Sequence, residues 1–368
     1  MRLGDEGLGF DSLERLEIAA ALSEALNMQY VGLDDRLLAR PTFGGWCDVA
    51  ARSLDSYSAT ITMRTSGSTG APRPFTHQIA RLLREVDSLI AVIGRHPGPG
   101  RIFTAVPSHH IYGFIFTVLL PHRLGDWAVL DIRDWSPSML IDGLCPGDLV
   151  IGHPVWWQAI VRGASSKAWP AGVTGVTSTG PCPADAAEAL LRLGLSRLLD
   201  IHGSTETAGL GWRDEPGKPY RLLPQWERSA PSSLRMTGGD DAREMVDVPD
   251  ALDCVDACHY RVAGRLDGAV QVGGTNVYPD RIAKILASHG LVRAASVRLM
   301  RDCEGRRLKA FIVPRERCAD TTALRTALEV FAKQSLTTPE QPRCWAFGHE
   351  LPTGPMGRST DWPIAASA

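Results

Sequence analysis

The segment best suited to chemistry is TSGSTGAPR, which runs from Thr65 to Arg73. Its small and hydroxyl residues let backbone N–H groups and hydroxyls approach a bound group closely, and Arg73 adds a positive charge. A loop of this kind suits the oxygens of a polyphosphate. The Gly-Lys-Ser/Thr ending of the mononucleotide phosphate loop is absent, and a flexible Ser/Gly turn would have the same composition.

Two further segments place polar side chains next to apolar runs. The sequence HGSTET (202–207) follows the strand-like run RLLDI, and it contains Glu206. A carboxylate is the ligand that Mg²⁺ takes beside phosphate oxygens, although a Thr-Glu pair after a strand is also a common helix start. The sequence VPSHHIYG (106–113) contains His109 and His110. Taken alone, such a histidine pair is more simply a surface or core feature.

In this order, the segments resemble the adenylate-forming enzymes: acyl-CoA synthetases, peptide-synthetase adenylation domains and luciferases. The phosphate loop of that family has the form TSGSTGxPK, which the chain matches except for Arg73 in place of lysine. Further matches are GRLDG (264–268) with GGTNVYP (273–279), and the tail segment LPTGPMGR (351–358). The resemblance runs from about residue 60 to 358, and is closest to short, 4-coumarate-CoA-ligase-like proteins of aryl polyene and xanthomonadin pigment clusters.

The resemblance implies a role for each matched residue. The residues implied in holding the β- and γ-phosphates of ATP are Thr65, Ser66, Gly67, Ser68, Thr69, Gly70 and Arg73. Thr205 would contact the phosphate of AMP and Glu206 would hold Mg²⁺. His110 would be a gating histidine beside the acyl pocket. The residues implied around the adenosine and the adjoining acyl pocket are Gly180, His202, Gly203, Asp250 and Arg265.

The ribose-binding aspartate is assigned by its register. Asp250 lies 15 residues before Arg265, the spacing that the family has between these two motifs, but its neighbours differ from the family's types. Asp247 and Asp253, three residues to either side, are the alternatives.

The implied reaction has two halves. A small carboxylic acid attacks the α-phosphorus of ATP and pyrophosphate leaves; the thiol of CoA, or of the phosphopantetheine arm of an acyl carrier protein, then displaces AMP. Three lysines of the family are replaced, by Arg73, Arg358 and Gln271. Arg358 stands at the position of the catalytic lysine, and a planar guanidinium is not a compact ammonium. A nucleotide-binding relative without activity, and a binding module without ATP chemistry, therefore remain as alternatives.

The elements that position these residues alternate between strands and helices. Strand-like runs at 59–65, 102–106, 148–151, 173–178 and 197–201, with helical stretches at 78–93 and 183–193, predict an α/β domain with mixed, largely parallel sheets flanked by helices. Asp11 is placed to cap a first helix with Leu13, Leu16, Ala19 and Ala20 roughly on one apolar face.

After residue 266 the pattern changes to a small α+β unit with a coil-rich tail. The division expected is 1–266 and 267–368, with Asp267 as the hinge on which the second domain rotates. About 64 residues precede the phosphate loop, fewer than the family's usual first subdomain. We therefore expect a truncated first lobe, whose flank a homodimer partner would cover.

The composition excludes several classes of partner. Lys plus Arg number 39 and Asp plus Glu 41, a net charge of −2, whereas nucleic-acid-binding proteins usually carry a basic excess. The longest apolar run, 111–121, is too short to span a bilayer. The first residues carry acids and no apolar core flanked by basic residues, so we expect no secretory signal, and the eight scattered cysteines predict a cytoplasmic protein with free thiols. Trp156 and Trp157 fit either a pocket for an aryl or short acyl group or the core.

Overall fold

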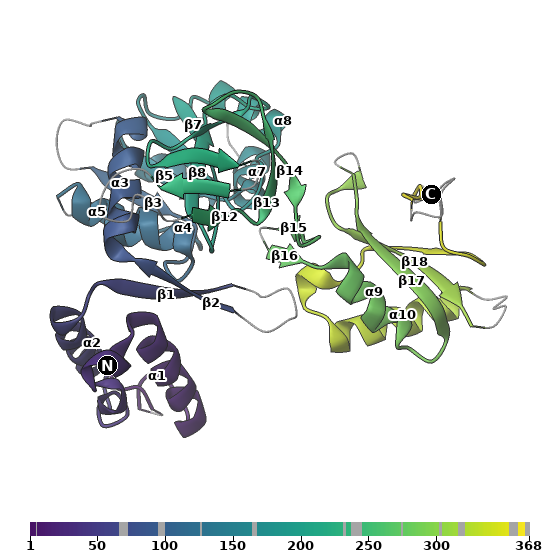
Figure 1. Cartoon of the computed structure of the whole chain (residues 1–368), viewed down its shortest axis with the longest axis horizontal. Helices are drawn as coiled ribbons and strands as arrows, with labels where there is room; N and C mark the ends of the chain where they lie inside the picture. The colour runs from purple at the N-terminus through teal and green to yellow at the C-terminus, as the bar shows by residue number, and fades with distance from the viewer. Residues whose placement is uncertain are drawn as a thin grey trace.

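The computed structural model describes residues 1–4, 6–65, 73–94, 100–125, 127–163, 168–230, 233–236, 245–273, 275–301, 304–315, 321–352 and 360–364. Figure 1 shows these residues as a small helical unit at the N-terminus, a large part built on a central sheet, and a smaller part at the C-terminus.

The N-terminal unit consists of α1 (Ser12–Leu26) and α2 (Phe43–Ser56), with short 3-10 turns at Met28–Val31 and Asp34–Arg36. The predicted cap is confirmed, because the Asp11 carboxylate accepts from Glu14 N at 2.8 Å and the Glu14 carboxylate accepts from Asp11 N at 2.9 Å. The predicted apolar face is confirmed for Ala19 and wrong for Leu13, Leu16 and Ala20, which are exposed. The core of this unit comes from residues on several segments: Leu3, Ala19, Met28, Leu37, Trp46 and Val49.

A hairpin and a helix connect this unit to the central sheet. Strands β1 (Thr60–Thr65) and β2 (Arg73–Gln78) pair antiparallel, and α3 (Ile79–Ile93) follows β2 directly. The nine strands of the central sheet lie in the order β13-β14-β9-β8-β7-β6-β5-β3-β4. Their bounds are β3 Arg101–Thr104, β4 Ala128–Asp131, β5 Leu149–Gly152, β6 Thr174–Thr177, β7 Arg197–Ser204, β8 Ala208–Arg213, β9 Tyr220–Leu222, β13 Asp250–Cys254 and β14 His259–Arg265.

The mixed α/β class is confirmed, and the sheet divides into two halves. The strands from β4 to β7 pair parallel, whereas β7, β8, β9, β14 and β13 pair antiparallel. The sequence analysis anticipates the parallel half, because buried parallel strands are continuous apolar runs. It does not anticipate the antiparallel strands after β7, which contain glycine and charged residues, as in β8 (AGLGWR) and β14 (HYRVAGR). A separate three-stranded sheet contains β10 (Trp226–Ala230), β11 (Ser233–Met236) and β12 (Met245–Asp247).

Alternate residues of the parallel strands fill two hydrophobic clusters. Ile102 and Leu199 belong to one cluster with α3, whereas their neighbours Phe103 and Leu198 belong to the other. Since successive strand residues point to opposite faces, helices must cover both faces. The helices of this part after α3 are α4 (Ile111–Phe114), a π-helical turn (Ile115–Leu119), α5 (Leu120–Arg123), α6 (Pro137–Gly143), α7 (Pro154–Gly163) and α8 (Ala184–Arg192).

The residues after 269 have a hydrophobic cluster of their own. A hairpin, β15 (Val270–Val272) with β16 (Thr275–Val277), precedes the sheet β17-β18-β19, with bounds Val292–Leu299, Leu308–Pro314 and Cys344–Phe347. Helices α9 (Pro279–Ala287) and α10 (Thr321–Ser335) contribute to this cluster, and Thr338–Glu340 is a 3-10 turn. The tail expected as coil thus contributes β19, which pairs parallel to β18. The division at Asp267 stays a prediction.

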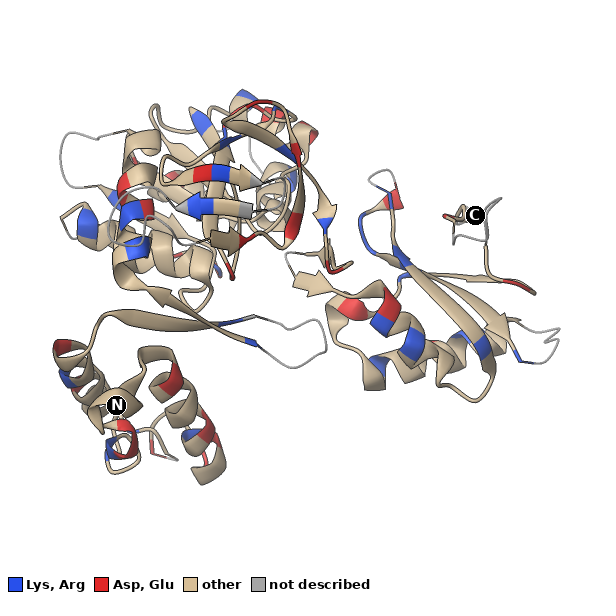
Figure 2. Cartoon of the chain, in the orientation of Figure 1, with Lys and Arg blue, Asp and Glu red and all other residues tan. Residues whose placement is uncertain are grey.

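Charged residues of both signs are mixed over the described ribbon (Figure 2). Among the residues that the structure describes, every helix is too short or too polar to cross a membrane.

Candidate functional site

The polar residues of the candidate site lie where three strands of the antiparallel half meet. Glu206 is in the turn between β7 and β8, Arg265 ends β14, and Asp250 begins β13 directly opposite Arg265 in the strand pairing. The guanidinium Nη2 of Arg265 lies 3.5 Å from Glu206 Oε1, and Asp250 Oδ2 lies 3.4 Å from Nε2 of His202 on β7. The fold thus brings together four predicted site residues that are up to 63 positions apart in the chain.

The neighbouring aspartates differ from Asp250 in their surroundings. The Asp250 side chain is buried beside His202. Asp247 ends β12 in a different sheet, and Asp253 lies further along β13; both are exposed. Of the three candidates, Asp250 is the one that is buried beside His202 and paired with Arg265, and its role at the ribose stays a prediction.

The Arg265 guanidinium interacts with three carboxylates of this group. Its Nη2 and Nε donate to the two carboxylate oxygens of Asp267 at 2.8 and 3.0 Å. Burial disfavours the guanidinium charge, but the carboxylates of Asp267, Asp250 and Glu206 outweigh it and raise the pKa of Arg265. The hydrogen bonds from Arg265 lower the pKa of Asp267. Both groups are therefore ionised at neutral pH.

A layer of aromatic and charged residues supports His202. Its Nδ1 lies 2.9 Å from the Tyr260 hydroxyl, and its ring centroid lies 5.4 Å from that of Tyr220. The Tyr220 hydroxyl donates to Asp200 at 2.9 Å, and Asp200 also accepts two bonds from Arg213. The sequence analysis missed these supports, although Asp200 stands two residues before His202 and so faces the same side of β7.

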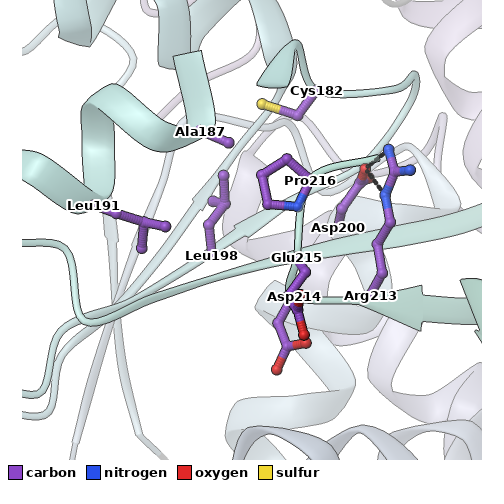
Figure 3. A pocket seen from close by; sticks show the side chains of 9 residues that line it. All are labelled: Cys182, Ala187, Leu191, Leu198, Asp200, Arg213, Asp214, Glu215 and Pro216. Atoms are coloured by element: carbon purple, nitrogen blue, oxygen red, sulfur yellow. Dashed lines mark hydrogen bonds and ion pairs between the residues drawn. The ribbon is translucent and has the colours of Figure 1, made fainter. Parts of the chain in front are cut away.

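Figure 3 shows a pocket beside this layer, in which Asp200 and Arg213 form an ion pair and Cys182 and Pro216 are among the lining residues. Burial raises the pKa of the Cys182 thiol to about 12. The thiol is therefore protonated at neutral pH, which makes it a poor nucleophile.

The segment around Gly180 meets the β15-β16 hairpin. A Cβ on Gly180 would lie 2.3 Å from the Gln271 side-chain oxygen, so a larger residue here would displace that side chain. Thr179 before it has φ +72°, a left-handed conformation that is strained for threonine. The hydroxyl oxygen of Thr179 and Oε1 of Gln271 are buried without a hydrogen-bond partner among the described residues. Unpartnered buried polar atoms of this kind fit a site that receives a polar ligand.

The histidine and tryptophan candidates lie in different surroundings. His110 is exposed at the start of α4, with its ring centroid 4.3 Å from that of His109. Trp157 is fully buried and donates to Val176 O at 3.2 Å, which identifies it as a core residue. Trp156 is half-buried against it.

Several predicted residues lie outside the described part of the chain, namely Ser66, Gly67, Ser68, Thr69, Gly70 and Arg358. The two residues that flank the phosphate loop are described: Thr65 ends β1 and pairs with Arg73, which begins β2 with an exposed side chain. Gly203, on β7, has no room for a side chain, because a Cβ would lie 2.2 Å from Ala208 O.

The residues present fit a magnesium ion bound with a nucleotide. Within the described ranges, His, Cys, Asp and Glu side chains form no cluster of three or more that would hold a metal unaided. Glu206 is a partly exposed carboxylate, and Mg²⁺ usually takes one or two protein carboxylates and completes its shell with phosphate oxygens and water.

The comparison with protein families decides the identity. The profile described as "AMP-binding enzyme" matches residues 20–235, more than half of the chain. The chain belongs to the AMP-binding enzyme family. This AMP-binding enzyme is 37% identical over 357 residues to a 4-coumarate–CoA ligase of Halorhodospira halophila, with 97% of this chain and 89% of the relative covered. It is 36% identical over 368 residues to a 4-coumarate–CoA ligase of Rhodobacter capsulatus, with 98% and 92% covered.

Solved structures agree on the fold of this AMP-binding enzyme. The amide bond synthetase McbA from Marinactinospora thermotolerans is similar with a TM-score of 0.63 and 16% identity, covering 95% of this chain and 87% of that chain. The predicted membership of the adenylate-forming superfamily, near the 4-coumarate-CoA-ligase-like proteins, is confirmed. The protein is an AMP-forming acid–thiol ligase, which activates a carboxylic acid with ATP and forms a thioester with CoA.

Proposed function

We propose that the enzyme activates a small aryl acid and that the residues around the β7-β8 turn hold the nucleotide during the reaction. The observation that carries the proposal is the convergence of Glu206, Asp250 and Arg265, with ion-pair distances of 3.4 and 3.5 Å joining His202 to Asp250 and Arg265 to Glu206. Two curated relatives are 4-coumarate–CoA ligases, which supports a 4-hydroxycinnamate-like acid.

In the first half-reaction, a carboxylate oxygen forms a bond to the α-phosphorus of ATP, and the bond to pyrophosphate breaks. Glu206 would hold Mg²⁺, which neutralises phosphate charge when bound. Asp250 and Arg265 would orient the ribose, with the His202 ring and the backbone of Gly203 and Gly180 at the adenine and acyl side. Thr205 and Arg358 would contact the α-phosphate. Such positioning and charge compensation supply most of the catalysis in phosphoryl-type transfers.

The triphosphate end would lie on the loop between β1 and β2. The residues proposed to hold the β- and γ-phosphates are Thr65, Ser66, Gly67, Ser68, Thr69, Gly70 and Arg73. In the second half-reaction, the thiol sulfur attacks the acyl carbon, the bond to AMP breaks, and the thiol proton passes to solvent. Rotation at Asp267 between the two halves, with His110 gating the acyl pocket, belongs to the same proposal.

The test is the carboxylate-dependent exchange of labelled pyrophosphate into ATP, measured with 4-coumarate, benzoate and acetate. We expect exchange with the aryl acids and a loss of at least about a hundredfold in Glu206→Ala, in line with the removal of one electrostatic contact at a transition state. Glu188→Ala is the matched control, because Glu188 is an exposed glutamate on α8.

The results separate the alternatives. Binding of ATP without exchange for any acid would indicate a catalytically impaired relative, as Arg358 and Gln271 suggest. Neither binding nor exchange would indicate a binding module. Exchange confined to acetate would overturn the aryl-acid proposal.

The thiol acceptor and the oligomeric state extend this proposal. A phosphopantetheinylated acyl carrier protein would be a second acceptor beside CoA, and thioester formation with each, measured from the same acyl-adenylate, distinguishes them. A homodimer would give twice the mass of 39.9 kDa in sedimentation equilibrium.

A further inference from the structure

Three charged or titratable side chains lie against the backbone of the β7-β8 turn and of the first residues of β8. His77 is near the end of β2, and Arg81 and Glu85 follow on α3 at intervals of four residues, which places them on one side of the helix. Their exposed fractions are 2%, 9% and 4%. Three such residues are rarely buried together without partners.

Each of the three binds a different backbone group of the turn or of the strand after it. His77 Nε2 donates to Thr205 O at 2.7 Å, and Arg81 Nη2 donates to Thr207 O at 3.3 Å. Glu85 accepts from Gly209 N, with both carboxylate oxygens at 3.0 Å. The three partners, Thr205, Thr207 and Gly209, are alternate residues of the chain. The contacts therefore form a ladder that flanks Glu206 and continues into β8.

A tryptophan completes the ladder at its far end. Trp226 Nε1 donates to Gly209 O at 2.7 Å, and the Arg81 guanidinium lies 5.0 Å from the centroid of the Trp226 ring. Gly209 therefore has both its N–H and its C=O bound. It also has no space for a side chain, since a Cβ would lie 2.4 Å from Glu85 Oε1.

The turn itself has a strained backbone. Ala208 has φ +58°, a left-handed conformation that costs free energy for a residue other than glycine. Local bonds contribute to holding it: Thr207 N donates to Ser204 Oγ at 3.2 Å and Thr207 Oγ1 donates to Ala208 O at 3.0 Å. Strained conformations persist where surrounding contacts over-determine them, and the ladder supplies such contacts.

We propose that His77, Arg81 and Glu85 are positioning residues, which hold the backbone of residues 205–209 so that Glu206 and Thr205 face the magnesium-bound phosphates. This inference rests on the proposed function of Glu206 and Thr205. The carbonyls of Thr205 and Thr207, on either side of Glu206, are bound from behind by His77 and Arg81. Without these bonds the turn has more freedom, and the Glu206 carboxylate has to be oriented when the nucleotide binds.

The decisive variant is His77→Leu, which removes the donor to Thr205. We expect the magnesium concentration for half-maximal pyrophosphate exchange, and the Kd for Mg·ATP by calorimetry, to rise about tenfold, equivalent to about 1.4 kcal/mol. The KM for the acid should change less than about twofold, because the substitution leaves the ground-state contacts of the acid unchanged. His77→Gln, whose side-chain amide can donate to Thr205 O, should restore most of the affinity.

Hydrogen exchange provides a readout that needs no nucleotide. Backbone amides of residues 205–209 should exchange faster in His77→Leu than in the wild type, whereas His289→Leu, a histidine substitution in the C-terminal part, should leave them unchanged. Arg81→Lys keeps a cation near Trp226 but shortens the reach to Thr207 O, so it should produce a smaller shift in the same direction if His77→Leu does not fold.

The failures are distinguishable. Absence of Mg·ATP binding and of exchange in the wild type would overturn the proposed function, and this inference with it. A folded His77→Leu protein with unchanged magnesium and ATP constants would overturn the inference alone. A loss of activity only in proportion to the unfolded fraction would likewise overturn it, since the ladder would then be structural.

Discussion

At the scale of the residue, burial gives the two glutamates near the β7-β8 turn different properties. The Glu206 side chain is 23% exposed and faces Arg265 at 3.5 Å, as a ligand for a hydrated cation would. Glu85 is 4% exposed, and burial raises its pKa to about 7, although the Gly209 N–H and the charge of Arg81 oppose this shift. Glu206 is therefore suited to bind an ion, and Glu85 is suited to hold the backbone at Gly209.

The raised pKa of Glu85 predicts a pH dependence of stability. Because its pKa rises from 4.5 in the unfolded chain to about 7 in the folded chain, its contribution is fully present below pH 4.5 and is lost as pH rises through 7. Glu85→Gln removes this dependence. We expect the free energy of unfolding of Glu85→Gln, relative to that of the wild type, to be about 2 kcal/mol higher at pH 8 than at pH 5.5, so that the variant is relatively more stable at pH 8. Urea titrations at both pH values measure it, and a constant difference would contradict it.

At the scale of the element, a buried lysine fastens the end of the described chain to the C-terminal sheet. Lys309, on β18, is fully buried. Its Nζ lies 3.0 Å from Glu304 Oε2 and 2.8 Å from Asp361 Oδ1, and it donates to Trp362 O at 2.8 Å. The Trp362 ring centroid lies 5.5 Å from the same nitrogen. A lysine is retained in this core because each of its protons has an acceptor.

Lys309→Met should release the segment that contains Asp361 and Trp362. Removing one partner of a buried ion pair leaves the charge of the other uncompensated. Because the Glu304 and Asp361 carboxylates are partly solvated, we expect the free energy of unfolding to fall by about 2 kcal/mol. The backbone amides of residues 360–364 should exchange faster than in the wild type under conditions in which the rest of the protein stays folded. Lys333→Met, an exposed lysine on α10, is the control. Equal protection of this segment in both variants would show that Lys309 does not anchor it.

At the scale of the whole molecule, the proposed hinge lies between the central sheet and the C-terminal part. Asp267 accepts from Arg265, from Ala269 N at 3.1 Å and from the Tyr278 hydroxyl at 3.2 Å. On the far side of the hinge, Gln271 lies against Gly180, and Arg306 donates to Pro181 O at 3.3 Å. Both contacts join the C-terminal part to the segment 180–181, so a rotation at Asp267 would have to break them.

Asp267→Pro tests the rotation. Proline restricts the backbone at this position, so we expect one half-reaction to fall by at least about tenfold while the other is retained, a difference of about 1.4 kcal/mol in barrier. Asp267→Ala removes the same side-chain bonds without restricting the backbone, and should affect both half-reactions less. Pyrophosphate exchange and thioester formation from isolated acyl-adenylate measure the two halves. Equal losses in both halves would argue against a hinge here.

The family, the order of the motifs and the parallel half of the sheet can be predicted from the amino-acid sequence. These features depend on short stretches of chain: a loop of small and hydroxyl residues, a Thr-Glu pair after a strand, and continuous apolar runs. Of the apolar face expected on α1, Ala19 is buried but Leu13 and Leu16 are exposed, because the core of this unit depends on residues from other segments such as Trp46.

Which residues meet depends on the packing of distant segments. Strand pairing sets Asp250, and neither Asp247 nor Asp253, opposite Arg265. The ladder of His77, Arg81 and Glu85 joins groups more than 120 positions apart. Burial and hydrogen-bond partners across such distances depend on how the strands and helices pack, and residue type with local spacing does not contain that information.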